Sequence, residues 1–186
     1  MENIEKINKK EYNNGELEFE GEYLNGERNG KGKEYNNGEL KFEGEYLNGK
    51  RNGKGKEYNN RNIIFDGEYL NGKRQGKGKE YDITLSYLSE YLNGKRNGKG
   101  KEYNYNGKLE FDGEYINGDK NGKGKEYYNG ELKFKGNYLN GERNGKGKQY
   151  NYYGKLLFEG EYINGERNGK GKEYNKNGEL YLKENI

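Results

Sequence analysis

The chain has 186 residues, of which 35 are Lys or Arg and 32 are Asp or Glu, so its formal net charge at pH 7 is only +3. A charge so close to balance is unlike the basic footprint of a nucleic-acid-binding protein, and nucleic acid is not expected as a partner. The sequence contains no His and no Cys, so the commonest general base and the thiol nucleophile are both missing. We therefore expect no enzyme activity, no cofactor and no metal site.

Only 27% of the residues are hydrophobic, which by itself would suggest disorder. Against this, the chain has 21 Tyr and 6 Phe, and these aromatics recur at fixed spacings in register with Gly. No apolar run reaches the roughly 18 residues of a membrane span, and the first residues lack the apolar core of a signal peptide. We expect an intracellular, cytoplasmic protein, with a membrane-peripheral position as the alternative.

The chain is organised as tandem repeats. Residues 1–8 are polar and are interpreted as a tail or a cap over the first strand, and a half copy of the repeat follows at Lys9–Leu17. Full copies then begin 22 to 24 residues apart, at Phe19, Phe42, Phe65, Tyr87, Phe111, Phe134 and Phe158. A fixed period of this size predicts a stacked array over residues 9–182 rather than one globular core. Residues 183–186 form the C-terminal end, where Lys and Glu are expected to guard an open strand edge.

Each copy reads as one β-hairpin. From Leu40 to Tyr46, apolar or Gly positions alternate with charged ones, which is typical of a half-buried strand. Asn48-Gly49 follows at once and is a strong hairpin-turn signal, and Gly53–Tyr58 supplies the return strand. The predicted fold is all-β: an elongated, single-layer antiparallel meander of tandem hairpins, forming a rod with a right-handed twist.

The spacing also predicts a strand register. A two-residue Asn-Gly turn in the first copy would place Phe19 opposite Gly32, and Glu20 opposite Lys31 on the other face. Large rings would then lie over glycines, which leave room for them. The turn at the other end of the return strand needs a register one residue different, so we predict a β-bulge between Gly32 and Tyr35.

Stacked hairpins would align the recurring rings into ladders that run across the strands. Each buried aromatic removes roughly 150–250 Å² from water, so the ladders are expected to supply most of the stability. The predicted structural set comprises Phe19, Tyr23, Phe42, Tyr46, Phe65, Tyr69, Tyr87, Tyr91, Phe111, Tyr115, Phe134, Tyr138, Phe158 and Tyr162.

The array is irregular in its middle. Asp82–Ser86 replaces the usual Asn-Gly connector, and Tyr87, Leu88 and Ser89 stand where Phe, an acid and Gly are expected. Drift at a tolerant site is the favoured interpretation. The alternative is a designed kink or a contact site, in which Tyr87, Leu88 and Ser89 would contact a partner.

A row of lysines recurs on the face opposite the rings. It is a candidate for binding anions or lipid headgroups, worth about 1 kcal/mol per charge near an anionic surface, and consists of Lys31, Lys54, Lys77, Lys99, Lys123, Lys146 and Lys170. The favoured alternative is that the lysines on this face are neutralised by cross-strand pairing with Glu20, Glu43, Asp66, Asp112 and Glu159. Lys135 and Leu88 interrupt this acidic row, and charge is expected to be exposed at both places.

The repeat pattern Y/F-x-G-x-Y-x-N-G-x-x-N-G-K-G-K-x-Y resembles the MORN repeat (membrane occupation and recognition nexus). The resemblance covers nearly the whole chain in seven copies, some of them close to a shorter variant of the repeat. The chain departs from the family where Tyr46 replaces a frequent Trp, and where Asn29, Asn52 and Gln75 replace a frequent His. The resemblance implies twisted single-layer sheets with a groove, used as scaffolds, dimerisation modules or partner-binding surfaces.

These observations together predict a non-catalytic scaffold or adaptor that binds another protein through its groove or strand edges. The alternative is a peripheral membrane module that binds anionic phospholipid through the lysine-rich face. Self-association through the end strands is compatible with either function. Four extra tyrosines could also bind a protein or a sugar: Tyr105, Tyr128, Tyr152 and Tyr153.

Overall fold

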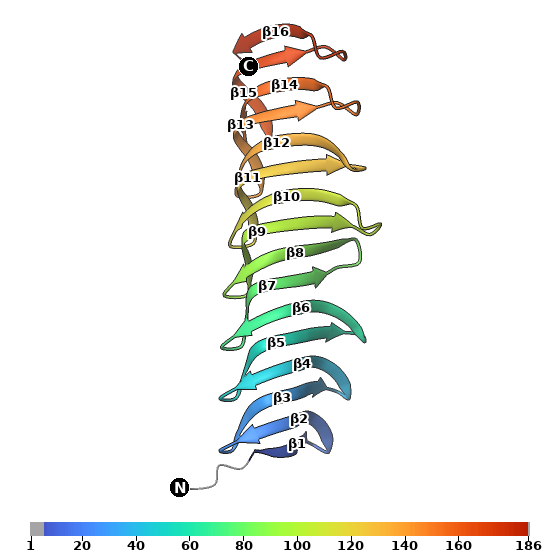
Figure 1. The fold of residues 1–186 in the computed structure, drawn as a ribbon, viewed down its shortest axis with the longest axis vertical. Coiled ribbons are helices and arrows are strands. Elements are labelled where there is room, and N and C mark those ends of the chain that lie inside the picture. The colour runs from blue at the N-terminus through green and yellow to red at the C-terminus, as the bar shows by residue number, and fades with distance from the viewer. Residues whose placement is uncertain (1–5, 186) are drawn as a thin grey trace. The chain divides into compact units, whose positions relative to one another are not determined.

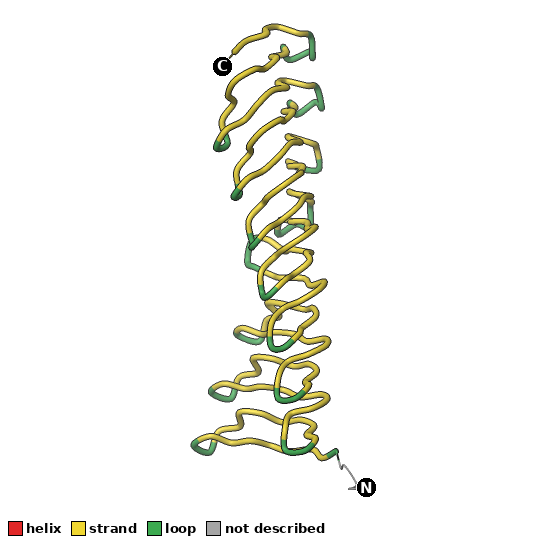
Figure 2. Tube along the Cα trace, turned by 90° about the vertical axis from the view of Figure 1, so that its left-hand side faces the viewer, coloured by secondary structure: helices red, strands yellow, loops and turns green. Residues whose placement is uncertain are grey.

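The computed structural model describes residues 6–185, and in this range it contains sixteen β-strands joined by short turns and no helix. Each strand is antiparallel to its neighbours in the chain wherever a register is defined, so the fold is an antiparallel meander (Figures 1 and 2). The predicted all-β fold of tandem hairpins is confirmed. The chain divides into two compact units.

The first unit covers the described residues up to Asp82 together with Tyr91–Gly94. Its strands pair in chain order in one layer. They are β1 (Ile7–Asn13), β2 (Glu16–Leu24), β3 (Glu27–Asn36), β4 (Glu39–Leu47), β5 (Lys50–Asn59), β6 (Asn62–Leu70) and β7 (Lys73–Tyr81). The predicted N-terminal tail, residues 1–8, lies largely outside the described residues, and β1 begins within it.

The second unit covers Ile83–Glu90 and the described residues from Lys95 onward. Strand β8 (Leu85–Leu92) is therefore divided between the units. The other strands of the second unit pair in chain order: β9 (Lys95–Asn104), β10 (Leu109–Ile116), β11 (Asp119–Tyr128), β12 (Glu131–Leu139), β13 (Glu142–Tyr150), β14 (Leu156–Ile163), β15 (Glu166–Tyr174) and β16 (Leu180–Asn185). The side chains of residues 183–186, which were expected to protect the strand edge with charge, lie outside the described part of the structure. The rod shape and its right-handed twist remain predictions.

The Asn-Gly pairs form the hairpin turns. Asn48 and Gly49 have φ angles of 49° and 76°, the paired positive values of a type I′ turn, which matches the twist of the flanking strands. The turn also ties one hairpin to the previous one, because the N–H of Gly49 donates to the carbonyl oxygen of Arg28 at 3.0 Å. The same bond recurs from Gly72 to Arg51 at 2.9 Å.

The register on the turn side differs from the prediction. Phe19 lies opposite Glu34 rather than Gly32, and Glu20 lies opposite Lys33 rather than Lys31. The register shifts beside the turn because Gly30 adopts a φ of 106°, which adds residues to the return strand without lengthening its partner. The prediction assumed a regular strand on both sides of a two-residue turn, so it could not reveal this irregularity beside the turn.

The register on the connector side agrees with the prediction. Glu34 lies opposite Phe42 and Tyr35 lies opposite Leu40, so the register shifts between Glu34 and Tyr35, and the extra residue is Lys41 of β4. The predicted irregularity between Gly32 and Tyr35 is therefore confirmed in position, but its extra residue lies in β4 and not in the return strand. Each regular hairpin thus carries one irregularity near its turn and one near its connector.

The core of each unit is a chain of rings on one face of the sheet. Phe19 contacts Tyr23 and Tyr46 with centroid distances of 5.7 and 5.1 Å, and Phe42 contacts Tyr46 and Tyr69 at 5.7 and 5.1 Å, all edge to face. The rings run across the strands as expected, but Phe and Tyr interleave in one zigzag and do not form one ladder of each kind. Edge-to-face packing directs the ring edge at the negative face of its neighbour, which favours this arrangement.

Candidate functional site

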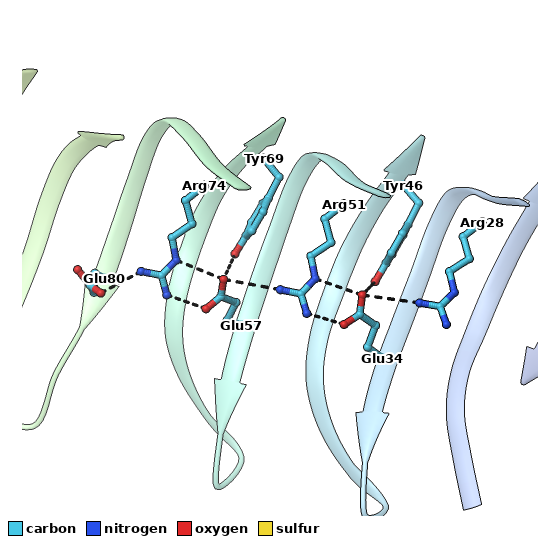
Figure 3. A network of polar contacts seen from close by, with 8 residues as sticks. All are labelled: Arg28, Glu34, Tyr46, Arg51, Glu57, Tyr69, Arg74 and Glu80. Atoms are coloured by element: carbon cyan, nitrogen blue, oxygen red, sulfur yellow. Dashed lines mark hydrogen bonds and ion pairs between the residues drawn. The ribbon is translucent and has the colours of Figure 1, made fainter. Parts of the chain in front are cut away.

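The aromatic face is closed by a polar network. The guanidinium carbon of Arg51 lies 4.1 Å from the centroid of the Phe42 ring. Nη2 of Arg51 donates to Oε2 of Glu34 at 2.5 Å, and the hydroxyl of Tyr46 donates to Oε1 of Glu34 at 2.7 Å (Figure 3). The Arg side chain is thus held flat over the ring by its carboxylate partner.

The same Arg–Glu–Tyr network recurs one hairpin further along the chain. Arg74 donates to Glu57 at 2.6 Å and to Glu80 at 2.9 Å, and the hydroxyl of Tyr69 donates to Glu57 at 2.7 Å (Figure 3). Burial would raise the pKa of Glu57, but the hydrogen bonds from Arg74 and Tyr69 outweigh it and hold that pKa below its ordinary value. Burial and the bond to Glu57 raise the pKa of Tyr69.

The second unit carries the same network with two substitutions. Lys120 stands where the other hairpins have Arg, and it pairs with Glu102 at 2.9 Å. Arg143 pairs with Glu126, but Gln149 stands at the next acidic position and accepts a bond from Arg167 at 2.9 Å. The sequence analysis predicts no role for these Arg and Glu residues. Both recur with the repeat period, and this recurrence is the signal that could have identified them. Because the network covers the rings, the face opposite the rings is the one open to a ligand.

The opposite face has a floor of paired glycines. In the first unit each glycine of one row lies directly opposite the next, across strands β2 to β7. The row consists of Gly21, Gly32, Gly44, Gly55, Gly67 and Gly78. Their missing side chains would point at the rings, since a methyl group on Gly55 would lie 2.4 Å from Cζ of Phe42. The glycines therefore expose only backbone on the opposite face.

This face is hollowed into one groove in each unit. The groove of the first unit has a volume of about 670 Å³ and that of the second about 1200 Å³. Both are lined by glycine backbone and by Lys, Asp and Glu side chains, and no ring lines either of them. The two grooves are the candidate binding sites.

One charged row runs beside the glycines on the connector side, and we call it the connector row. In the first unit its members alternate in sign across neighbouring strands: Lys10, Glu20, Lys33, Glu43, Lys56, Asp66 and Lys79. Ion pairs follow this alternation at 3.4 Å for Lys10–Glu20 and 3.8 Å for Lys56–Asp66. In the second unit Lys101 pairs with Asp112 at 3.0 Å, and Lys148 with Glu159 at 2.7 Å.

The other charged row lies on the turn side of the glycines and contains the seven lysines predicted as an anion or lipid face. Lys31, Lys54, Lys99, Lys123, Lys146 and Lys170 line the grooves, and Lys77 does not. Within residues 6–182, none of these ammonium groups lies within ion-pair distance of a carboxylate. The acids predicted to neutralise the lysine face lie instead in the connector row, opposite its own lysines.

The acids of the turn-side row face a different donor. Oε2 of Glu22 accepts the backbone N–H of Lys31 at 3.1 Å, and Glu114 accepts that of Lys123 at 3.0 Å. These carboxylates thus satisfy the backbone at the irregularity created by the positive-φ glycine, at Gly30 in the first case. At Lys31, Lys99 and Lys123 the neighbouring carboxylate is thus bound to backbone, and the three lysines line the grooves.

The residues proposed at the irregular repeat do not form one surface. Ser89 is only 4% exposed and lies against Gly100 on the aromatic face, whereas Leu88 is half exposed. Tyr87 is half-buried, with the guanidinium of Arg96 4.1 Å from its ring centroid, and it is the one member of the predicted aromatic set that is not buried. The extra tyrosines are exposed, and Tyr152 contacts Tyr153 edge to face at 5.9 Å.

Two further features bear on the class of site. The described part of the chain holds no group of three or more acidic side chains placed to bind a metal ion. Among the residues with assigned structure, no helix has the length and apolar character needed to cross a membrane.

Comparison with known families gives one result. The model of the MORN repeat matches seven tandem segments, which together exceed half of the chain: residues 19–39, 42–62, 65–83, 87–108, 111–131, 134–151 and 158–179. No curated protein matches the chain. MORN repeats are non-enzymatic modules that generally mediate interactions with proteins or membranes. The seven matches, the hairpin meander and the glycine-floored grooves together establish that this chain belongs to the MORN repeat family.

Proposed function

We propose that the chain is a non-catalytic scaffold that binds a protein partner through the grooves of its charged face. The observation that carries this proposal is the pair of grooves, about 670 and 1200 Å³ in volume, on the face that the Arg–Glu–Tyr network leaves open. Small-molecule sites typically enclose about 300–1,000 Å³ and are mostly apolar. Open grooves of this size with charged walls suit a polypeptide segment better.

The groove walls support specific rather than general attraction. Lysines and carboxylates alternate along most of the connector row, so its charge is locally balanced. A partner must place a charge of opposite sign beside each charged residue of the groove wall, because a like charge there would be repelled. Electrostatic patterning of this kind selects a partner and its register.

Site-directed crosslinking tests the proposal. The chain has no Cys, so a single introduced cysteine provides the only attachment point for a photo-crosslinker. We expect Lys54→Cys, in the first groove, to capture a defined set of proteins from native lysate that Asn62→Cys, exposed at the start of β6 and outside the groove, does not capture. Identical capture from both positions, or none from Lys54→Cys, would contradict the proposal.

A second candidate function is binding to anionic phospholipid through the turn-side lysines. Support comes from their unpaired ammonium groups, since Lys31, Lys54 and Lys146 have no carboxylate of the described chain within ion-pair distance. Each such charge near an anionic leaflet contributes about 1 kcal/mol, which falls off within a Debye length. Flotation with vesicles of phosphatidylcholine and phosphatidylserine decides this candidate, and absence of flotation at low salt excludes it.

A further inference from the structure

Strand β12 differs from the corresponding strands at two groove positions. In β4 these positions are Glu43 and Glu45, whereas in β12 they are Lys135 and Asn137. Both residues of β12 line the groove of the second unit. One strand has therefore lost both of the carboxylates that its counterpart presents to the groove.

The loss concentrates positive charge on three adjacent strands. Lys135 lies opposite Lys125 of β11 and Lys148 of β13, and Asn137 lies opposite Lys123. With Lys146, strands β11 to β13 present five lysines and no carboxylate to the groove. The corresponding strands β3 to β5 present four lysines and two carboxylates, so their formal charge is +2 against +5.

Among the described side chains, only one of the five lysines forms an ion pair with a carboxylate. Lys148 pairs with Glu159 at 2.7 Å, and Nζ of Lys135 lies 5.8 Å from the ring centroid of Tyr150. Lys123, Lys125, Lys135 and Lys146 have no ion pair with any carboxylate whose side chain the structure describes. We call Lys123, Lys125, Lys135, Lys146 and Lys148 the five-lysine cluster.

We propose that the five-lysine cluster is a docking site for an acidic segment of a partner polypeptide, lying along the groove of the second unit. The proposal rests on the proposed function and names the chemistry that one groove recognises. Charge complementarity carries it, because five mutually repelling ammonium groups are stabilised when carboxylates lie among them. Carboxylates of the partner take the place of the two acids that β12 lacks.

The form of the groove favours a peptide over a flat or uniform polyanion. The net positive charge of this groove lies on β11–β13, because outside these strands three lysines are matched by four acids. The flanking acids, such as Asp112 and Glu159, would repel a uniform polyanion. Strands lie about 4.8 Å apart, so three of them span about 10 Å, and alternate side chains of an extended peptide are about 6.8 Å apart. Two or three acidic residues at alternate positions therefore match the cluster.

The test restores to β12 the two carboxylates that β4 carries. Lys135→Glu with Asn137→Glu recreates the residues of β4 and should fold, because other copies carry them. The probe is a fluorescent decapeptide in which Glu alternates with Ser, measured by anisotropy on the full chain. We expect the restored variant to bind it at least about tenfold more weakly than the parent, and binding by the parent to weaken with salt.

A matched control separates local from net charge. Lys50→Glu with Asn62→Glu makes the same substitutions in the first unit, at positions where other copies have Glu27 and Glu39. This control should bind the peptide as the parent does. The reverse transplant, Glu43→Lys with Glu45→Asn, should create a second site in the first groove.

Three outcomes would overturn the proposal: no binding of the acidic peptide by the parent, equal binding by the restored variant, or binding only to vesicles with about 20% phosphatidylserine. The crosslinking test of the proposed function is independent of these outcomes. If Lys54→Cys still captures its partners while the acidic peptide does not bind, the acidic-segment proposal fails and the scaffold proposal stands.

Discussion

At the scale of the residue, glycine decides where the rings can lie. A methyl group on Gly55 would lie 2.4 Å from Cζ of Phe42 and 3.2 Å from Cε2 of Tyr69. Neither ring can move far, because each is wedged edge to face against its neighbours. The glycine row is therefore a packing requirement of the aromatic face, and the groove floor on the opposite face is its by-product.

The substitution Gly55→Ala should destabilise the fold by about 1–3 kcal/mol, the usual cost of overpacking a core. Urea unfolding followed by circular dichroism measures it. The cost should shrink in a Phe42→Leu background, because the Cζ atom that the methyl group meets is then absent. An equal cost in both backgrounds would mean that strand propensity, and not the ring, explains the loss.

At the scale of the element, each hairpin is bonded to the next by an Arg–Glu–Tyr network. Glu57 of β5 accepts from Tyr69 of β6 and Arg74 of β7, and Arg74 also reaches Glu80. Its carboxylate is therefore bonded to two other strands, and the bonds to a charged group are the stronger kind. The network locks the register of the hairpins while shielding the rings.

Replacing Glu57 with Gln should destabilise the protein by about 1.5–3 kcal/mol at neutral pH, because Arg74 loses a charged acceptor. The second unit offers the opposite change, since Gln149 occupies the equivalent position and contacts Arg167 at 2.9 Å. Gln149→Glu should stabilise the fold. Chemical denaturation of both variants checks the pair, and the same sign of effect for both would contradict the role given to the carboxylate.

Acid should weaken the network. The pKa values of Glu34, Glu57 and Glu126 are lowered in the folded state from an ordinary value of 4.5, because hydrogen bonds from Arg and Tyr outweigh the effect of burial. A lowered folded pKa gives stability that is present above pH 4.5 and lost as the pH falls through the folded pKa. Denaturation at a series of pH values should show this fall, and the difference between the parent and Glu57→Gln should vanish with it.

At the scale of the whole molecule, the sheet is built from contacts between neighbours in the chain. Each strand of a unit pairs only with the strand before it and the strand after it. Stability in such arrays is approximately a sum of repeat and neighbour terms. Within residues 6–185, strand pairing therefore joins only residues of the same or adjacent hairpins.

Deleting residues 42–64 removes one period and joins Lys41 to Phe65, which preserves the strand pattern. The shortened chain should keep a β-type far-UV spectrum and unfold at a lower temperature. Deleting only residues 42–52 removes half a hairpin and reverses the direction of every later strand, so it should fail to fold. If the full-period deletion also abolished folding, the additive view of the array would be wrong.

Much of this protein is determined by its sequence, because its period is short and its contacts are local. Alternation of rings and charges, with Asn-Gly turns, was enough to place the hairpins and the register shift before Tyr35, although the extra residue lies in the facing strand. The repeat pattern likewise led to the family. Each of these depends on residues within one or two copies of each other.

The tertiary structure decided which side chains meet. The positive φ of Gly30 shifts the register, so that Glu20 faces Lys33 and the turn-side lysines remain unpaired. Only the folded arrangement shows that arginines cover the rings and that the grooves lie on the charged face. Lys135 could be recognised in the sequence as a break in an acidic row, but its place among four other lysines depends on strand pairing, which brings together residues from three strands.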